Sequence, residues 1–221
     1  MSETLHKQKG SIYTAAYWLI PVLLLLLADI WLVFIRRKYF FDNQVFASLS
    51  PCISVGTTSF MKKVTFLGKH SFLIPANLSL ITFFICWKKG KTAWRIAATA
   101  LSSLALMSLL KNLFQRQRPA GPLVEGITNF SFPSGHAFMG VVFFGLLIWL
   151  AIKYIRNKPA RITVIAISLL LILLIGFSRI YLRVHYATDV IAGFCMGTLW
   201  LVFSLWLTNK LRPVSGFVTK H

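Results

Sequence analysis

Residues 162–181 read ITVIAISLLLILLIGFSRIY, and this apolar run indicates the class of fold. It has the roughly 20 residues that a helix needs to cross the hydrocarbon core of a bilayer. Further blocks of the chain are similarly long and apolar, so we predict an all-α polytopic membrane protein with six transmembrane helices. The predicted spans are 13–35, 71–87, 95–114, 135–155, 162–181 and 188–208.

The composition of the whole chain points the same way. Hydrophobic residues make up 57% of the 221 residues and charged residues 13%, against about 45–50% and about 25% in soluble domains. The mean hydropathy is +0.70. These values exclude a disordered chain, a coiled coil and almost any soluble enzyme. Because no internal repeat or low-complexity tract is visible, we expect residues 1–221 to form a single membrane-embedded domain.

The positive charge of the chain lies beside the apolar blocks. The formal net charge is +19, from 24 Lys and Arg against five Asp and Glu. Short basic clusters between spans are typical of loops that face anionic lipid headgroups, whereas a nucleic-acid-binding protein carries a basic face on one element. We therefore expect the bilayer as a partner and no nucleic acid. The cysteines Cys52, Cys86 and Cys195 match no disulfide or zinc pattern.

The basic residues also predict an orientation. With a cytoplasmic N-terminus, the inner loops collect 13 of the 24 Lys and Arg. Five of the others lie beside the polar motifs described below: Lys111, Arg116, Arg118, Arg179 and Arg183. The positive-inside rule then places both termini in the cytoplasm. The run at 13–35 is longer than the ~7–15-residue apolar region of a signal peptide, so we expect it to stay attached.

The connection from Arg36 to His70 is long and carries many aromatic residues among polar ones. We predict that it forms one or two helices in the outer membrane interface rather than an irregular loop. From its position alone, this segment would guide or cover a lipid.

Three polar clusters interrupt the apolar pattern, at places where ionisable residues are costly and usually functional. All three are predicted at the outer ends of spans three to six. The first, residues 111–119, reads KNLFQRQRP. Lys111 and Arg118 are two helical turns apart and would share one face if the helix ran that far, before Pro119 ends it. Taken alone, this cluster also fits a basic helix end that snorkels to the interface.

The second cluster, residues 132–136, reads FPSGH and directly precedes an apolar run. Ser134 is a natural N-cap, and Gly135 lets backbone N–H groups approach a ligand closely. The free N–H groups and the dipole of a helix N-terminus favour an anion there. An ordinary cap after a proline turn would explain Ser134, but it leaves the position of His136 unexplained.

The third cluster, residues 178–189, reads SRIYLRVHYATD and contains Arg179. His185 and Asp189 are i and i+4, within contact distance on one helix face. A carboxylate held against one imidazole nitrogen leaves the other nitrogen as a nucleophile or base. Alone, the two side chains also fit a satisfied interfacial His–Asp pair.

Together the clusters supply three basic residues, a helix N-terminus and two histidines. This set suits the binding of a tetrahedral oxyanion and the transfer of its phosphoryl group, a reaction in which positioning and charge stabilisation provide most of the catalysis. Asp189 is the only acid within the clusters, so we expect no metal and no cofactor.

The motifs Lys-x6-Arg-Pro, Pro-Ser-Gly-His and Ser-Arg-x5-His-x3-Asp resemble the three-part signature of the type 2 phosphatidic acid phosphatase superfamily. This superfamily includes bacterial membrane lipid phosphatases and vanadium haloperoxidases. All eleven defining positions match, namely Lys111, Arg118, Pro119, Pro133, Ser134, Gly135, His136, Ser178, Arg179, His185 and Asp189.

The resemblance implies a role for each matched residue. His185 would attack phosphorus to form a phosphohistidine, with Asp189 orienting it. His136 would protonate the leaving oxygen and then help to activate water. His185 must then be neutral to attack while His136 is protonated to donate, which predicts a bell-shaped pH profile. The phosphate oxygens would be bound by Lys111, Arg118, Arg179, Ser134 and the Gly135 amide.

The implied protein is a metal-independent lipid phosphatase in the inner membrane of a bacterium, with its site facing the periplasm or the outside. Its substrate would be undecaprenyl diphosphate, phosphatidylglycerophosphate, phosphatidate or the lipid A phosphate. We favour the first, because a compact six-span protein with an outward site suits recycling of a carrier lipid. Transfer of the phosphoryl group to another lipid is an alternative activity.

A transporter or channel component is an alternative of a different class, but its charges would be spread through the membrane depth. A haloperoxidase would need vanadate and normally a soluble scaffold. The sequence assigns no role to Asp29, Glu125 or Arg183, and no oligomeric state.

Overall fold

The computed structural model describes residues 17, 19–36, 39–127 and 129–211. Within these ranges the regular structure is helical and contains no strand. The first helix runs over Leu19–Ile35 and ends in the π-helical stretch η1 (Trp31–Ile35). The elements that follow are α2 (Phe40–Leu49), η2 (Ser50–Cys52), α3 (Val55–Phe66), α4 (His70–Cys86), α5 (Gly90–Phe114), α6 (Gly135–Tyr154), α7 (Lys158–Tyr181) and α8 (Ala187–Lys210).

Five described segments are long and apolar enough to cross a membrane: Val55–Cys86, which joins α3 and α4, and the helices α5, α6, α7 and α8. The first helix and Phe40–Cys52 together reach the necessary length, but they are bent by 98° to one another. The prediction of an all-α membrane protein is confirmed, whereas the number of six spans is not. Residues 13–16 and 18 of the first predicted span, and both termini, lie outside the described residues.

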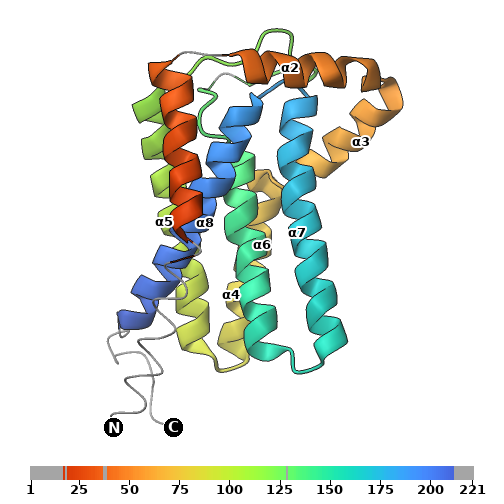
Figure 1. The fold of residues 1–221 in the computed structure, drawn as a ribbon. Helices are drawn as coiled ribbons and strands as arrows, with labels where there is room; N and C mark the ends of the chain where they lie inside the picture. The colour runs from red at the N-terminus through yellow and green to blue at the C-terminus, as the bar shows by residue number, and fades with distance from the viewer. Residues whose placement is uncertain (1–16, 18, 37–38, 128, 212–221) are drawn as a thin grey trace.

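Helix α6 lies in the middle of the bundle, where it packs along α7 and α8 (Figure 1). This position follows from its sequence, because α6 is apolar on all sides and buries side chains around its whole circumference. Two glycines of α8 allow its backbone to lie close to the backbone at the start of α6. A Cβ on Gly193 would lie 2.7 Å from the carbonyl oxygen of Ser134, and one on Gly197 would lie 2.9 Å from that of Phe138. Small residues thus bring the start of α8 against the start of α6.

Residues 39–69, which we call the cap segment, form α2, η2 and α3. Helix α2 lies across one end of the bundle, and α3 slants back from it toward α7 (Figure 1). Ser54 caps α3 by accepting a hydrogen bond from the backbone N–H of Thr57 at 3.2 Å. The hydroxyl of Tyr181, at the end of α7, lies 2.5 Å from Thr57 Oγ1 and ties the two helices together. Helices between Arg36 and His70 are therefore confirmed, and their position in the membrane interface stays a prediction.

The directions of the helices bring the three polar clusters to the same end of the bundle. Helices α5 and α7 run toward the end that α2 covers, while α6 and α8 start there (Figure 1). The C-terminal turns of one pair and the N-terminal turns of the other thus meet under the cap segment.

Candidate active site

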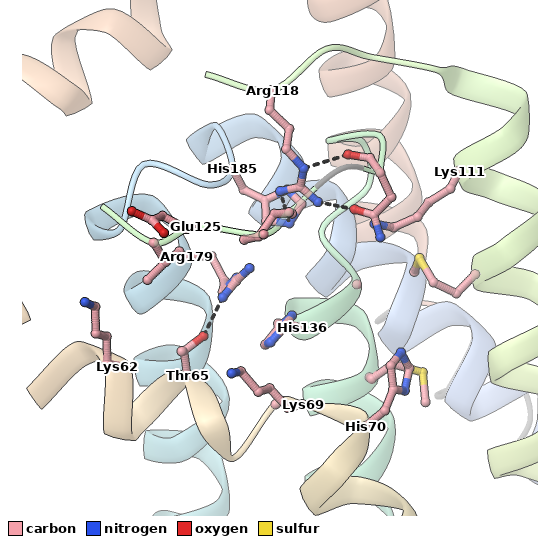
Figure 2. A pocket seen from close by; sticks show the side chains of 18 of the residues that line it. Lys62, Thr65, Lys69, His70, Lys111, Arg118, Glu125, His136, Arg179 and His185 are labelled. Atoms are coloured by element: carbon pink, nitrogen blue, oxygen red, sulfur yellow. Dashed lines mark hydrogen bonds between the residues drawn. The ribbon is translucent and has the colours of Figure 1, made fainter. Parts of the chain in front are cut away.

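A pocket of about 860 Å³ opens beneath the cap segment and brings most of the predicted site together. Figure 2 shows His136, His185, Lys111, Arg118 and Arg179 around this one space. Six of the eight predicted site residues line it: Lys111, Arg118, Gly135, His136, Arg179 and His185. The other two, Ser134 and Asp189, are fully buried behind the lining.

His185 lies in the short connection between α7 and α8, and its side chain is almost completely buried. Its Nδ1 lies 3.5 Å from Oδ2 of Asp189, which is in the first turn of α8. Burial lowers the pKa of His185 to about 4, although Asp189 raises it, and the positive charges of Arg118 and Arg179 lower it further. Above that pH the imidazole is neutral. Its Nε2 lies 3.3 Å from Nη1 of Arg118, on the pocket side of the ring.

Asp189 is held from several directions. Its Oδ2 accepts hydrogen bonds from Ser131 Oγ at 2.5 Å and from the backbone N–H of Tyr186 at 2.9 Å. Its Oδ1 accepts one from Nη1 of Arg116 at 2.5 Å. A carboxylate with these three donors is held as an anion in a fixed orientation behind the imidazole of His185.

His136 stands in the first turn of α6, which Ser134 begins. Ser134 accepts a hydrogen bond from the N–H of Ala137 at 3.5 Å, so it is the N-cap that the sequence predicts. Nε2 of His136 is buried and has no hydrogen-bond partner among the described residues. Gly68, between α3 and α4, packs closely over the ring, and a Cβ there would lie 2.9 Å from Cδ2 of His136.

The three predicted cations reach the pocket from different elements. Lys111, in the last turn of α5, donates to the carbonyl of Phe130 at 3.1 Å. Arg118 donates from Nε to the carbonyl of Asn129 at 2.7 Å and also to the carbonyl of Val184. Burial lowers the pKa of Arg118, while Asp189 raises it. Arg179, near the end of α7, donates to Oγ1 of Thr65 at 2.7 Å.

The expected shared helix face of Lys111 and Arg118 does not form. Helix α5 ends at Phe114, and Gln115 adopts a left-handed conformation with φ of 44°. Arg118 therefore lies on the loop that follows α5. Its side chain is held at the pocket by hydrogen bonds to the backbone carbonyls of Asn129 and Val184. The seven-residue spacing brings the two cations to the same pocket, but not by helical periodicity.

Several residues around the site were not predicted as part of it. The cap segment contributes Thr65, Gly68 and Lys69 to the pocket lining. Ser131 and Asp42 are buried in contact with Asp189 or its partner Arg116. No local motif marks these positions, although Ser131 directly precedes the FPSGH cluster.

The three polar residues without an assigned role fall in different places. Glu125 lines the pocket. Asp29 is buried in the first helix, and its Oδ2 has no partner among the described residues. Arg183 lies over the ring of Phe46, 5.7 Å from its centre. In the part of the chain that the structure describes, no group of three or more His, Cys, Asp and Glu side chains is arranged to hold a metal ion.

Comparisons with known proteins agree with this site. A family model described as the PAP2 superfamily matches residues 92–213, which include all three clusters. The chain is 31% identical over 155 residues to phosphatidylglycerophosphatase B of Bacillus subtilis, covering 69% of this chain and 75% of that protein. It is 26% identical over 194 residues to an undecaprenyl-diphosphatase of Sulfolobus acidocaldarius, covering 85% and 88% respectively.

A solved structure extends the likeness to the fold. The crystal structure of a transmembrane phosphatidylglycerolphosphate phosphatase of the PAP2 type from Bacillus subtilis superimposes with a TM-score of 0.80 at 23% sequence identity. The superposition covers 89% of this chain and 98% of the other.

Proposed function

The chain belongs to the PAP2 superfamily, and from that premise we propose that it is a membrane lipid phosphatase that works through a phosphohistidine at His185. The observation that carries this proposal is the position of His185 between Asp189 and the pocket. One ring nitrogen faces a fixed carboxylate, and the other lies on the pocket side, among three cations. A neutral imidazole held in this way is an activated nucleophile.

The proposed reaction has two steps. Nε2 of His185 attacks phosphorus, the P–O bond to the lipid breaks, and His136 gives its proton to the leaving oxygen. Water then attacks the phosphohistidine, the P–N bond breaks, and His136 takes a proton from that water. Lys111, Arg118 and Arg179 would hold the phosphoryl oxygens in both steps, together with Ser134 and the Gly135 amide.

His136 fits the acid role through its surroundings. Its Nε2 is buried and has no hydrogen-bond partner in the described part of the chain, so it is free to bond a substrate oxygen. A bound phosphate dianion would place negative charge beside this nitrogen and stabilise the imidazolium. The substrate itself thus helps to protonate the group that releases the lipid.

We further propose that no metal takes part and that one domain carries the whole reaction. Asp189 is already engaged by Ser131, Tyr186 and Arg116. Among the described residues, no third His, Cys, Asp or Glu side chain is arranged with the two histidines to complete a ligand set. The positive charges would supply the stabilisation that a metal ion provides elsewhere.

The pocket holds more positive charge than one phosphate needs. Besides the three cations of the site, Lys62 and Lys69 line it, and the only acid in the lining is Glu125. A phosphate monoester carries about −1.5 to −2 at neutral pH. This balance favours a lipid with a second phosphate beside the scissile one, as in undecaprenyl diphosphate or phosphatidylglycerophosphate, over phosphatidate or the lipid A phosphate.

The site is proposed to face the periplasm or outside of a bacterial inner membrane, with both termini in the cytoplasm. The short loops at the opposite end of the bundle, 87–89 and 155–157, carry Lys88, Lys89 and Arg156, and this basic charge supports a cytoplasmic position for that end.

The test is phosphate release by the purified protein, with a chelator present, from each of the four lipid classes. We expect release from at least one lipid, none from His185→Ala, and an unchanged thermal transition in that variant. Activity that requires added metal would contradict the mechanism. Label that moves to a second lipid instead of water would establish a phosphotransferase, and passage of an ion or solute without any phosphoryl transfer would favour a transporter.

Substrate choice has a matched test. The double substitution Lys62→Gln and Lys69→Gln should raise KM for the two-phosphate lipids about tenfold and leave phosphatidate within about twofold. Lys63→Gln is the control, because Lys63 is also on α3 but does not line the pocket. Equal effects on all lipids would show that the two lysines serve general attraction to the membrane.

A further inference from the structure

Asp42 of α2 is buried far from the three polar clusters in sequence but directly behind them in space. Only 1% of its side chain is exposed. Its Oδ1 accepts a hydrogen bond from the backbone N–H of Thr188 at 3.0 Å, and its Oδ2 accepts one from the Thr188 hydroxyl at 2.8 Å. The same Oδ2 lies 2.9 Å from Nη2 of Arg116. The acid is therefore docked on the first turn of α8, one residue before Asp189.

Arg116 joins the two carboxylates. Its Nη1 donates to Oδ1 of Asp189 at 2.5 Å and to the hydroxyl of Thr188 at 2.8 Å, while its Nη2 donates to Asp42. The guanidinium also lies beside two aromatic rings, 4.1 Å from the centre of Tyr186 and 5.4 Å from that of Tyr39. Burial by itself lowers the pKa of Arg116, but Asp189 and Asp42 outweigh it, and the net pKa is raised. Arg116 is a permanent buried cation.

We propose that Arg116 and Asp42 are positioning residues for the nucleophile, forming a chain His185–Asp189–Arg116–Asp42 that fixes the orientation and the effective charge of Asp189. This inference rests on the proposed function, because the four linked side chains would act through the proposed reaction at His185. It makes α2 of the cap segment part of the catalytic unit rather than a cover over it.

The charges explain why the chain would need both outer members. Arg116 alone would face Asp189 with its full charge and weaken the field that stabilises an imidazolium or phosphohistidine at His185. Asp42 offsets that charge, so Asp189 keeps its negative potential while Arg116 still holds its Oδ1. Without Arg116, the buried carboxylates of Asp42 and Asp189 would lie on either side of Thr188 with no cation between them, and their repulsion would destabilise the folded state.

The alternative is that this network only anchors α2 to the bundle. Buried ion pairs commonly have no more than a structural role, and removing one partner destabilises the protein whatever else the pair does. The test must therefore read a property of His185 that anchoring alone would not change.

The pH dependence of kcat/KM provides that property. The charged and titratable groups that face His185 are Asp189 from α8, Arg118 from the loop after α5, Arg179 from α7, His136 from α6 and Lys111 across the pocket from α5. All of these stay in place in variants of Asp42 and Arg116. A shift of the acid limb in such variants then reports the outer members of the chain.

The two substitutions predict shifts of opposite sign. Asp42→Asn leaves Arg116 less compensated, which disfavours protonated His185 and moves the acid limb to lower pH. Arg116→Gln leaves Asp189 uncompensated, which favours protonated His185 and moves the limb to higher pH. We expect each shift to be roughly half a pH unit or more. The double variant, which keeps only the charge of Asp189, should fall between the wild type and Arg116→Gln.

Thr188→Val is the matched structural control. It removes the hydroxyl contacts to Asp42 and Arg116 without changing any charge, so the thermal transition should fall while the acid limb stays in place.

The expected kcat of Asp42→Asn is about tenfold below the wild type with KM changed less than twofold, and Asp42→Glu should recover part of the loss.

The outcomes are separable. Unshifted limbs in Asp42→Asn and in the double variant, with thermal transitions lowered as in Thr188→Val, would overturn the inference and leave the network as an anchor. If Arg116→Gln does not fold, Asp42→Asn and Arg116→Lys still decide the sign, because Arg116→Lys keeps the charge and should not shift the limb. Absence of phosphate release by the wild-type protein would instead refute the proposed function.

Discussion

The burial of His185 predicts where the acid limb of the pH profile lies. Burial lowers the pKa of this imidazole to about 4, and attack on phosphorus needs the neutral form. At pH 5 such a group is about 90% neutral, whereas an imidazole with the unperturbed pKa of about 6.5 is about 3% neutral. The two cases differ about 30-fold in the reactive fraction. We therefore expect kcat/KM to lose little of its value through protonation of the nucleophile between pH 7 and pH 5.

The assay is initial phosphate release in detergent micelles from pH 4 to pH 9, with a chelator and constant ionic strength. The substrate phosphate itself ionises near pH 6, so its protonation must be followed in the same micelles by phosphorus NMR. Dividing the rates by the fraction of each substrate form isolates the enzyme groups. Loss of the proton from His136 beside a bound phosphate would instead limit kcat, which reports the enzyme–substrate complex, on the alkaline side.

The lowered pKa of His185 also predicts how the free energy of unfolding changes with pH. A histidine with a lowered folded-state pKa stabilises the fold fully above the unfolded value of about 6.5, and this contribution is lost as the pH falls toward 4. His185→Gln should lack that part of the slope. A corrected acid limb near pH 6.5 in the wild type, together with identical stability slopes, would refute the argument that His185 is buried and neutral in the working enzyme.

Other changes test the packing around the site. Gly68→Ala should lower kcat about 10- to 100-fold with the fold retained, because the new Cβ would lie 2.9 Å from Cδ2 of His136 and displace the ring; unchanged kinetics would mean that the ring can move freely. Gly193→Ala should destabilise the protein by roughly 1–3 kcal/mol, since its Cβ would lie 2.7 Å from the backbone oxygen of Ser134; a thermal melt checks this, and no loss would show that α8 can shift. Tyr181→Phe removes the hydroxyl that ties α7 to α3 and should cost about 1 kcal/mol, read as a lower Tm.

The apolar runs and the three clusters could be predicted from the sequence because each depends on local chemistry. A helix in a bilayer must satisfy its own backbone, so long apolar blocks allow few alternatives. Polar residues at membrane depth are costly, so His136 and His185 stand out from their surroundings. The i, i+4 spacing predicted the pairing of His185 with Asp189, but not its geometry, because His185 lies in the connection before α8 and not on a face of that helix.

What the sequence could not predict depends on contacts between distant segments. The end of α5 at Phe114 results from a left-handed Gln115, and periodicity gave no sign of it. Asp42 looks like an ordinary polar residue in an aromatic-rich connection. Its burial follows from the docking of α2 on α8, and no local pattern in residues 36–70 specifies that docking.

The cap segment contacts the catalytic machinery at three separate points. Through Asp42, α2 reaches Arg116 and so Asp189. Through Thr65, α3 accepts a hydrogen bond from Arg179 at 2.7 Å. Gly68, at the break before α4, packs on His136.

Each contact involves a residue within 92–213, the region that the family model matches, while the cap segment lies outside it. Under the proposed function, the matched region would carry the reacting groups, and the cap segment would fix their orientation. The three contacts come from one continuous segment. A substitution that displaces the cap segment from the bundle would therefore loosen His136, Arg179 and Asp189 together. Substitutions of Asp42, Thr65 or Gly68 should therefore act on kcat even though none of these residues is proposed to touch the reacting phosphate.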